Sequence, residues 1–461
     1  MEKSRQDYLK ASGFTALLFF FIVSRLFAQT SESLFDGKTL KGWKQVAGSA
    51  AYQVANGEIV GTTVAGTGNS FIVTDKEYTD FILELDLKLE SPKGNSGVQV
   101  RSHYDPSGNK GKGKVYGRQA ELDPTSRQWS GGIYDEGRRE WLYPLSLNPS
   151  AGAAYKPNAF NHLKIECIGN VMKTWINGTP AAYMIDTLDR SGFIGLQVHG
   201  ITDSSEAGKK VYFKNIQIKT VGIKPAAFPS GLYVVNYQSN TLSSYEKTDG
   251  WKLLFDGSTS NGWRSAHADA FPARGWKVEK GTISVLPAEG KESTNGGDIV
   301  TKEEFAAFDL SFEFKLSPGA NSGVKYFVTL KEQSAGSAIG LEYQVLDDDL
   351  HPDAKLGRDG NRTLASLYDL IKANKTQRFI HPIGSWNAGR VVVYPDNKVE
   401  HYLNGIKVLE YQRGSAAFRQ LVATSKYKDW KEFGEAKSGH ILLQDHGNQV
   451  SFRSIKVKSL K

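Results

Sequence analysis

Polar side chains alternate with apolar ones in two β-like segments, and their types could support acid–base chemistry. Glu342 and Gln344 stand two residues apart, so on a strand they share one face, roughly 7 Å from each other. Gln119, Glu121 and Asp123 share a face in the same way. A carboxyl group can move a proton, and amides bind hydroxyl groups. These segments predict a groove that binds a polar substrate and transfers protons.

Two Gln-x-His pairs extend this candidate site. Gln197 and His199 occur near the end of one half of the chain, and Gln444 and His446 near the end of the other. Imidazole titrates near neutrality, which suits proton transfer. The alternative is structural, because polar alternation is often only the solvated face of a strand, and either histidine could be buried with satisfied hydrogen bonds.

Aromatic residues and arginines occur beside these segments. Tyr134 and Trp141 lie in an Arg-rich stretch, and Tyr368 lies in the matching stretch of the other half. Aromatic faces stack on the apolar faces of sugar rings, and arginine binds oxygen atoms with its fork of donors. The composition favours a carbohydrate-binding surface over an ordinary loop.

Several other classes of site are not supported. The sequence has no Gly-rich phosphate loop, no Cys-x-x-Cys pair and no His-Glu-x-x-His, which argues against NAD, ATP and structural zinc. The net charge of +8 is spread without a dense basic block, so we expect no nucleic-acid partner. The single cysteine, Cys167, cannot form an internal disulfide and is expected in the core. Asp347-Asp348-Asp349 with His351 and Asp353 allow a divalent cation, although an exposed acidic turn is the favoured interpretation.

The elements that position these residues come from a duplication. The repeated blocks are Leu34-Phe35-Asp36-Gly37 with 254–257, Asn95-Ser96-Gly97-Val98 with 321–324, Asn177-Gly178 with 404–405, and 195–200 with 442–447. They keep their order, so the sequence predicts domains at about 30–221 and 249–461, with a linker over 222–248. Within that linker, residues 232–237 alternate weakly and could pair with a neighbouring sheet.

The pattern inside each copy is that of strands. Residues 81–89 and 308–316 alternate with period two, and Asn-Gly pairs mark tight hairpin turns. Helical periodicity is scarce. The expected fold is all-β, with two tandem antiparallel β-sandwich (jelly-roll) domains.

The N-terminus has the features of a targeting segment. Basic residues precede an apolar run over 14–23, which is too short to span a bilayer. Residues 1–28 are predicted to be a signal peptide cleaved after Ala28. We therefore expect a secreted, bacterial periplasmic protein without a membrane span in its mature chain, the alternative being a retained anchor.

The repeated blocks, together with 342–347, 351–353, 366–369 and 443–447, resemble the 3-keto-disaccharide hydrolase family. That resemblance implies the concanavalin-A-like lectin/glucanase fold in both copies. It also implies cleavage of glycosides oxidised at C3, by removal of the C2 proton and elimination at C1, with or without later addition of water. A small-molecule or oligosaccharide substrate follows, and no cofactor is certain.

The implied roles in the second copy give proton transfer to Glu342 and His446. The residues expected to bind substrate there are Lys325, Gln344, Asp347, Tyr368 and Gln444.

In the first copy, Glu121 and His199 are expected to match Glu342 and His446. The residues expected to bind substrate are Arg101, Gln119, Asp123, Tyr134, Trp141 and Gln197. The copies differ, since Gln99 stands where the second copy has Lys325 and the first copy lacks a segment like 351–353. One copy could cleave while the other binds sugar, or the two could prefer different substrates. We favour the second copy as the catalytic one, because its blocks fit the family better.

Two other functions stay open from the sequence. The chain could be a non-catalytic tandem carbohydrate-binding protein, or a conventional endoglucanase with a Glu-x-Asp-x-x-Glu strand. Glu121 and Glu84 each begin that endoglucanase pattern, but its later Glu is absent from both. The glycoside, its anomer and the oligomeric state are not determined.

Overall fold

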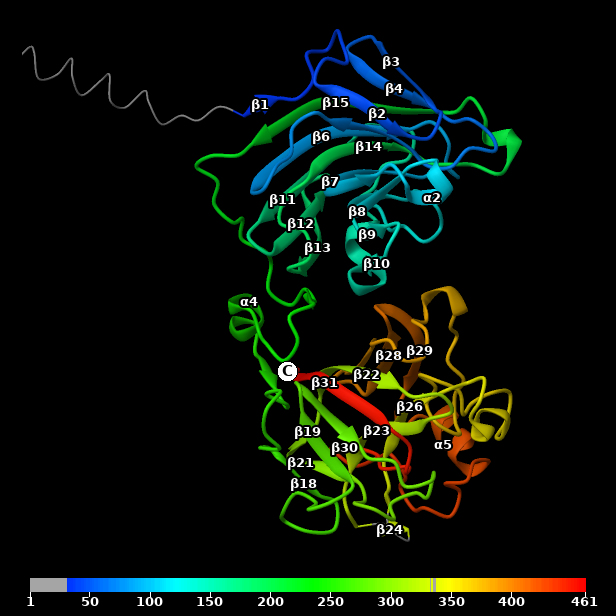
Figure 1. Cartoon of the computed structure of the whole chain (residues 1–461). Helices are drawn as coiled ribbons and strands as arrows, with labels where there is room; N and C mark the ends of the chain where they lie inside the picture. Colours follow the sequence, from blue (N-terminus) through cyan, green and yellow to red (C-terminus); the bar gives the residue numbers. More distant parts are fainter. Residues whose placement is uncertain (1–30, 332, 335–336) are drawn as a thin grey trace, which may run out of the picture.

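The computed structural model describes residues 31–331, 333–334 and 337–461. The predicted signal peptide lies outside these described residues. Two β-sandwiches stand one above the other, joined on one side by a linker (Figure 1). No helix in the described part of the chain is both long and apolar enough to cross a membrane.

The first sandwich pairs a nine-stranded sheet with a seven-stranded one. The larger sheet contains, in spatial order, β16 (Val235–Asn236), β13 (Thr179–Ile185), β12 (Val171–Ile176), β11 (Asn161–Ile168), β6 (Phe81–Leu89), β15 (Lys210–Lys219), β4 (Glu58–Thr62) and β3 (Ala51–Ala55), with β1 (Glu32–Ser33) also on β15. The smaller contains β10 (Glu140–Tyr143), β9 (Ile133–Glu136), β8 (Lys114–Leu122), β7 (Ser96–Asp105), β14 (Phe193–Val198), β5 (Ser70–Thr74) and β2 (Trp43–Ala47).

The second sandwich repeats this plan with an eight-stranded and a five-stranded sheet. The larger contains β19 (Trp276–Glu279), β20 (Thr282–Val285), β31 (Val450–Ser459), β22 (Phe308–Leu316), β27 (Asn387–Val393), β28 (Lys398–Leu403) and β29 (Ile406–Gln412), with β17 (Trp251–Leu253) also on β31. The smaller contains β18 (Trp263–Ser265), β21 (Ile299–Phe305), β30 (Gly439–Leu443), β23 (Asn321–Val328) and β26 (Leu341–Leu346). A separate ribbon pairs β24 (Gln333–Ser334) with β25 (Ser337–Ala338).

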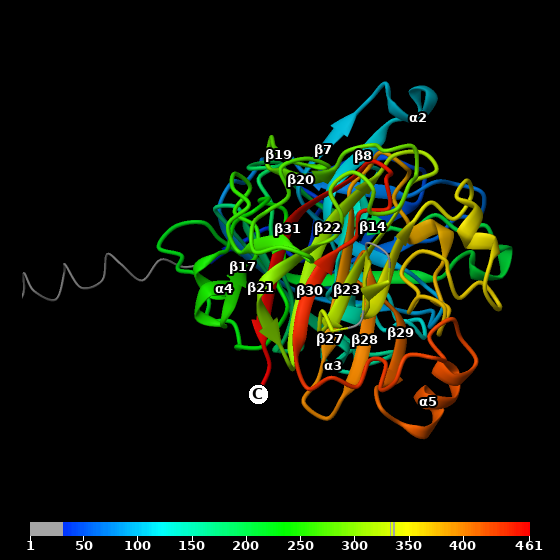
Figure 2. The same cartoon turned by 90° about the horizontal axis from the view of Figure 1, so that it is seen from below.

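Helices are short and peripheral. They are α2 (Gly108–Gly111), α3 (Pro149–Gly152), α4 (Ser244–Thr248), α5 (Ala416–Ala423) and the 3₁₀ turns η1 (Leu145–Leu147), η2 (Ser204–Glu206), η3 (Pro352–Lys355) and η4 (Gln377–Phe379). Seen from below, α5 lies at the edge of the second sandwich (Figure 2). The all-β, jelly-roll prediction is confirmed.

The alternation in the sequence explains why the two sheets of each sandwich pack together. In β6 the odd positions, from Phe81 to Leu89, are buried, and the even positions are partly exposed. In β22 the apolar residues Phe308, Leu310, Phe312 and Phe314 are fully buried. Each fully buried side chain of this size contributes about 1.5–3 kcal/mol. The apolar faces of the two sheets therefore pack against each other. The outer face of each sheet, which points away from the core, carries polar groups.

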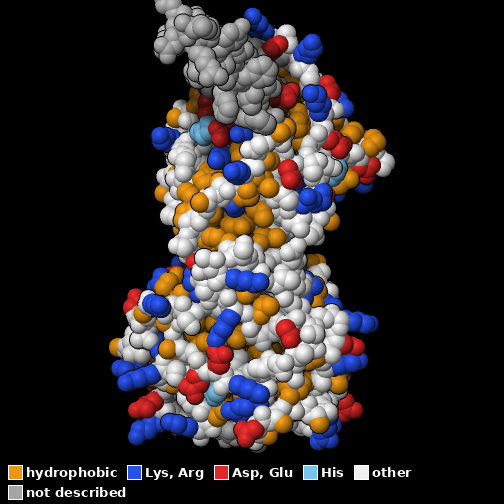
Figure 3. Space-filling model, turned by 90° about the vertical axis from the view of Figure 1, so that its left-hand side faces the viewer, with side chains coloured by type: hydrophobic (Ala, Val, Ile, Leu, Met, Phe, Trp, Pro, Cys, Tyr) orange, Lys and Arg blue, Asp and Glu red, His pale blue; other side chains and the backbone are white. Residues whose placement is uncertain are grey.

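The segment between the copies is docked on both sandwiches. β16 pairs in parallel with β13, so Val235 and Asn236 of the weakly alternating segment 232–237 join a sheet. This parallel pair departs from the expected all-antiparallel arrangement. Ser243 and Glu246 cap α4 reciprocally, and Glu246 also binds Lys456 of β31 at 2.5 Å. Figure 3 shows hydrophobic side chains gathered on the first sandwich, just above the narrow region where the two sandwiches meet.

The two sandwiches also contact each other directly. The first sandwich's apolar core extends to Val392 and Tyr402 of the second. Ser146 of η1 donates to the carbonyl oxygen of Gly405, in the β28–β29 turn. The eight-stranded sheet therefore faces the first sandwich, and the five-stranded sheet lies on the far side (Figure 1).

Candidate functional site

The five-stranded sheet carries a cluster of ionisable side chains on its outer face, which points away from the core. Val324 and Tyr343 point into the core, so their neighbours Lys325 and Glu342 point outward from it. Gln344 follows on the same face of β26, and Gln444 comes directly after β30. The shared face of Glu342 and Gln344, expected from period two, is confirmed, and Lys325 of β23 joins it as the register partner of Glu342.

Glu342 and Lys325 stand directly opposite each other. They are register partners in the β23–β26 ladder, and each is 4% exposed. Gly323 makes room for the carboxyl group, since a Cβ there would lie 2.2 Å from Oε1 of Glu342. Nζ of Lys325 donates to the carbonyl oxygen of Ala338 at 3.0 Å and lies 3.6 Å from Oδ2 of Asp298.

Burial and neighbouring charges set the protonation of this pair. Burial raises the pKa of Glu342 to about 7, while Lys325 and then Lys426 pull it down. Burial also opposes the charge on Lys325, but Asp298 and then Glu342 raise its pKa above the usual value. A carboxyl group that exchanges its proton near pH 7 is thus held beside a cation.

Lys426 is a second cation here, and the sequence analysis did not identify it. Its Nζ lies 4.2 Å from the ring centre of Tyr368 and 5.2 Å from that of Tyr427. Burial lowers the pKa of Lys426, and Glu342 partly opposes that shift. Lys426 follows α5, more than eighty residues after Glu342, so no spacing in the sequence could associate them.

Tyr368 lies next to Glu342 as a wall of the cluster. Its backbone N–H donates to the carbonyl oxygen of Glu342, and its hydroxyl donates to Asp353 at 2.8 Å. Arg362 holds Asp353 from the other side, at 2.9 Å. The expected Tyr368 is therefore brought to the site, held through Asp353.

His446 lies with His351 at the end of β30. Their ring centroids are 5.4 Å apart, nearly perpendicular. Nδ1 of His446 and Oε1 of Gln444 are buried and have no hydrogen-bond partner among the described residues. Nε2 of Gln444 donates to Glu292 at 3.1 Å. Buried polar atoms are normally hydrogen-bonded, so this end of the sheet has two polar atoms whose hydrogen bonds are not made by the described residues.

Asp347 has a structural role, and its expected part in substrate binding is not supported. Its carboxylate accepts backbone N–H groups of Gly319, Asp349 and Leu350. Asp348 pairs with Lys375 at 2.7 Å. In the part of the chain that the structure describes, no three His, Cys, Asp or Glu side chains gather as a metal site.

The first sandwich has a corresponding polar face on its seven-stranded sheet. Nε2 of Gln119 donates to Oε2 of Glu121 at 2.9 Å, and Asn95 donates to Oε1 at 2.5 Å. Burial raises the pKa of Glu121 to about 7, against the hydrogen bonds from Gln119 and Asn95. Gln197 continues the row, at 3.3 Å from Gln119.

The two copies differ in where the carboxyl group sits. In the second, Lys325 opposes Glu342; in the first, Gln99 opposes Gln119, and Glu121 opposes Gly97 as Gln344 opposes Gly323. Gln119 is therefore the structural counterpart of Glu342, and the expected match of Glu121 with Glu342 is wrong. Counting from Gly117 and Gly340, which begin the two segments, would have given this alignment.

Arg101 is not part of the groove. It is fully buried, and its guanidinium binds the carbonyl oxygens of Thr79 and Gly169 and the carboxylate of Asp80. Its φ of 48° marks a bulge in β7, which turns the side chain off the polar face. The expectation that Arg101 binds substrate is corrected accordingly.

The other expected residues of the first copy do meet in one groove of about 280 Å³. Its lining includes Gln119, Glu121, Asp123, Tyr134, Trp141, Gln197 and His199, together with Asn69, Asn95, Glu136 and Arg378. Nδ1 of His199 lies 2.6 Å from the carbonyl oxygen of Gly200, and burial lowers the pKa of this imidazole. Arg378 comes from the second sandwich.

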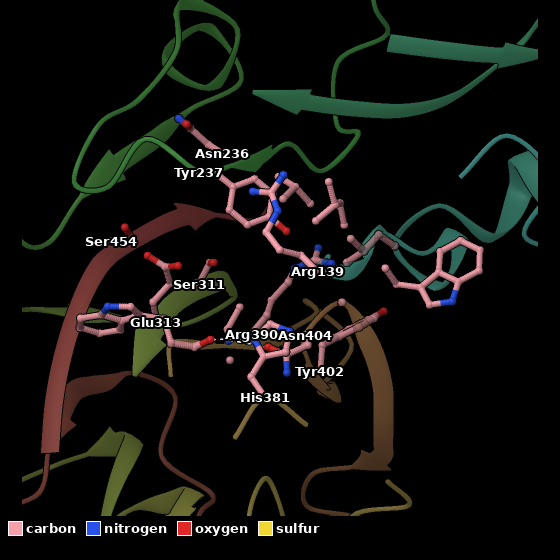
Figure 4. Close-up of a pocket in the computed structure, with 18 of the residues that line it drawn as sticks. Arg139, Asn236, Tyr237, Ser311, Glu313, His381, Arg390, Tyr402, Asn404 and Ser454 are labelled. Carbon is pink, nitrogen blue, oxygen red and sulfur yellow. Dashed lines mark hydrogen bonds between the residues drawn. The ribbon is translucent and has the colours of Figure 1, made fainter. Parts of the chain in front are cut away.

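A larger cavity, of about 560 Å³, lies between the sandwiches. Figure 4 shows Arg139 and Tyr237 above it and Arg390, Tyr402 and His381 below. Its cations are already paired: Arg139 binds Asp186, Arg390 binds Asp309, and Arg453 binds Glu313. Each of these pairs lies within one sandwich and fixes side chains that line the cavity.

Comparison with known proteins supports a carbohydrate-active family. A 3-keto-disaccharide hydrolase from Bacteroides thetaiotaomicron is 40% identical over 233 residues, which cover 46% of this chain and 79% of that protein. A solved structure of a candidate glycosyl hydrolase from Parabacteroides distasonis is 29% identical, with a TM-score of 0.42 over 49% of this chain and 100% of that one. A carbohydrate-binding module from Bacillus subtilis is 19% identical, with a TM-score of 0.24 over 39% and 95%.

The family assignment covers both sandwiches. Residues 30–219 and 250–458 each match the family model described as the 3-keto-alpha-glucoside-1,2-lyase-like domain. The chain therefore belongs to the 3-keto-alpha-glucoside-1,2-lyase-like family and carries two copies of its domain in tandem.

Proposed function

We propose that this protein cleaves 3-keto-glycosides and that the second sandwich performs the reaction with Glu342 as the base. The proposal rests on one observation: Glu342 and Lys325 are buried cross-strand partners on the outer face of the five-stranded sheet. A ketone at C3 acidifies the C2 proton, so the reaction needs a base near neutrality and a cation beside it.

In the first step, Glu342 removes the proton from C2 of the sugar. The electron pair of that C–H bond forms the C2–C3 double bond, and the C3 oxygen becomes an enolate. Lys325 and Lys426 carry positive charge toward that oxygen, and a charge developing in a buried site is strongly stabilised by fixed cations. Tyr368 supports this position through the contact of its ring with Lys426.

In the second step, the C3 carbonyl re-forms and the C1–C2 double bond appears while the C1–O bond breaks. The leaving oxygen takes a proton, which we assign to His446, because its Nδ1 has no hydrogen-bond partner among the described residues. The products are an unsaturated keto-sugar and an alcohol. Addition of water at C1 would convert the sum into hydrolysis.

The test compares Glu342→Gln with Glu121→Gln on a methyl glucoside oxidised at C3 and on the unoxidised glucoside. We expect wild type to act only on the oxidised compound, and Glu342→Gln to lose about 10²- to 10⁴-fold in kcat/KM, the range typical of a general base. Glu121→Gln serves as the matched control and should stay within twofold.

Incorporation of deuterium from D₂O at C2 reports the first step separately. It should disappear in Glu342→Gln, with thermal unfolding used to verify that the variant is folded. Unchanged turnover and exchange in that variant would remove Glu342 from the mechanism.

A further inference from the structure

The groove of the first sandwich lacks the charged pair that the proposed reaction uses. Gln99 and Gln119 occupy the positions of Lys325 and Glu342 and are joined by a neutral hydrogen bond of 2.7 Å. Glu121 lies one pair further along and is held by two amides rather than by a cation. Lys93, Arg127 and Arg378 also line the groove, but none of these cations lies on the strands that form its floor.

The groove nevertheless has the chemistry of a sugar site. Trp141 and Tyr134 form an aromatic wall, with ring centroids 5.4 Å apart. Amides and carboxyls line the floor and can bind hydroxyl groups as donors and acceptors. At about 280 Å³ the groove is at the small end of ligand pockets, which suits a single pyranose unit.

The second sandwich completes this groove with Arg378. Its Nε donates to Glu140 at 3.2 Å, and its positive charge acts on both Tyr134 and His199. The guanidinium is 56% exposed, and its ion pair is at the surface, where such pairs contribute about 0–1 kcal/mol. The fork of donors can therefore turn to a ligand at little cost.

The backbone that presents Arg378 is fixed at the interface. The next residue, Phe379, packs on Trp129 with ring centroids 6.0 Å apart, and Trp129 packs edge-on against Trp141. Asn404 donates to the carbonyl oxygen of Phe379 at 2.8 Å. A residue of one sandwich is thus held over the groove of the other by the contacts that join them.

We propose that the first sandwich binds an unoxidised glucoside without cleaving it, and that Arg378 of the second sandwich is a specificity-determining residue of that site. This inference rests on the proposed function, because it assigns cleavage to one copy and retention of the glycan to the other. The protein would hold an intact sugar in the first groove while the second sandwich acts on oxidised units.

The test is calorimetric titration of the full chain with methyl α-D-glucopyranoside and methyl β-D-glucopyranoside. We expect at least one of them to bind at one site per chain, and Arg378→Ala to weaken that binding at least fivefold. Arg378→Lys should restore it only in part, since lysine has no planar fork. Arg419→Ala is the matched control, because Arg419 is an exposed, ion-paired arginine of the same sandwich, bound to Glu435.

Two further measurements separate this inference from the proposed function. Glu342→Gln should lose turnover of the 3-keto-glucoside and still bind the unoxidised glucoside, and Arg419→Ala should retain both turnover and binding within twofold of wild type. Binding of neither glucoside, wild-type binding by Arg378→Ala, or loss of binding in Glu342→Gln would each overturn the inference. Loss of turnover in Glu121→Gln but not in Glu342→Gln would instead overturn the proposed function.

Discussion

At the scale of single residues, the most informative feature is a carboxyl group whose proton is lost near neutrality. Burial raises the pKa of Glu342 to about 7, and the base is active only when it has lost its proton. We therefore expect kcat/KM for a 3-keto-glucoside to rise with pH through an apparent pKa near 7. A profile measured between pH 5 and 9 checks this.

Replacement of Lys325 tests whether the acid limb of the pH profile reports the titration of Glu342. Lys325 lowers the pKa of Glu342, so Lys325→Gln should move the acid limb of the profile to higher pH as well as slow the reaction. Lys375→Gln, which changes a partly buried lysine paired with Asp348, is the control and should leave the limb in place. A limb that does not move in Lys325→Gln would contradict the assignment of this titration to Glu342.

Part of this site could be predicted from sequence and part could not. Period two placed Glu342 and Gln344 on one face, because strand geometry decides which side chains of one strand share a face. The expected role of Arg101 was wrong, since a bulge with positive φ turns its side chain off the polar face and has no signature in the residue types. Period two could not reach Lys426, which a loop brings to the strand.

At the scale of elements, the same hairpin turn occurs in both copies but has different surroundings in each. Gly178 and Gly405 both follow Asn in a tight turn, with φ of 81° and 80°. A Cβ at Gly178 would meet nothing within 4 Å, whereas one at Gly405 would lie 2.9 Å from Pro144 of the first sandwich. The repeat in sequence predicted both turns but not that the second is also an interface contact.

This difference gives a matched pair of variants. Gly178→Ala should cost about 1–2 kcal/mol in the free energy of unfolding, from the left-handed backbone alone. Gly405→Ala should cost more than Gly178→Ala, because it adds a clash with Pro144 to the same strain. Chemical denaturation followed by tryptophan fluorescence measures both. Equal losses would mean that the contact at Pro144 contributes nothing to stability.

At the scale of the whole molecule, the segment between the copies binds both sandwiches through Tyr233. Its carbonyl oxygen accepts a hydrogen bond from Tyr143 of the first sandwich, and its hydroxyl lies 2.8 Å from Ser311 of the second. Its ring lies under Arg390, 4.3 Å from the guanidinium carbon. The expected linker composition gave no sign of this role, because Gly, Pro and Ser indicate a break in regular structure without indicating what the segment packs against.

Because of these contacts, we expect the two sandwiches to unfold together and Tyr233→Ala to separate them. Wild type should give one calorimetric transition, whereas Tyr233→Ala should give two, since it removes the ring under Arg390 and the bond to Ser311. Tyr212→Ala is the control. Tyr212 lies on the first sandwich under Lys88, away from the interface, and its loss should lower the transition temperature without splitting the transition.

A single transition in Tyr233→Ala would show that the apolar contact of Val392 and Tyr402 with the first core suffices to couple the sandwiches. Two transitions would show that Tyr233 couples the two sandwiches. The position of Arg378 over the first groove would then depend on Tyr233.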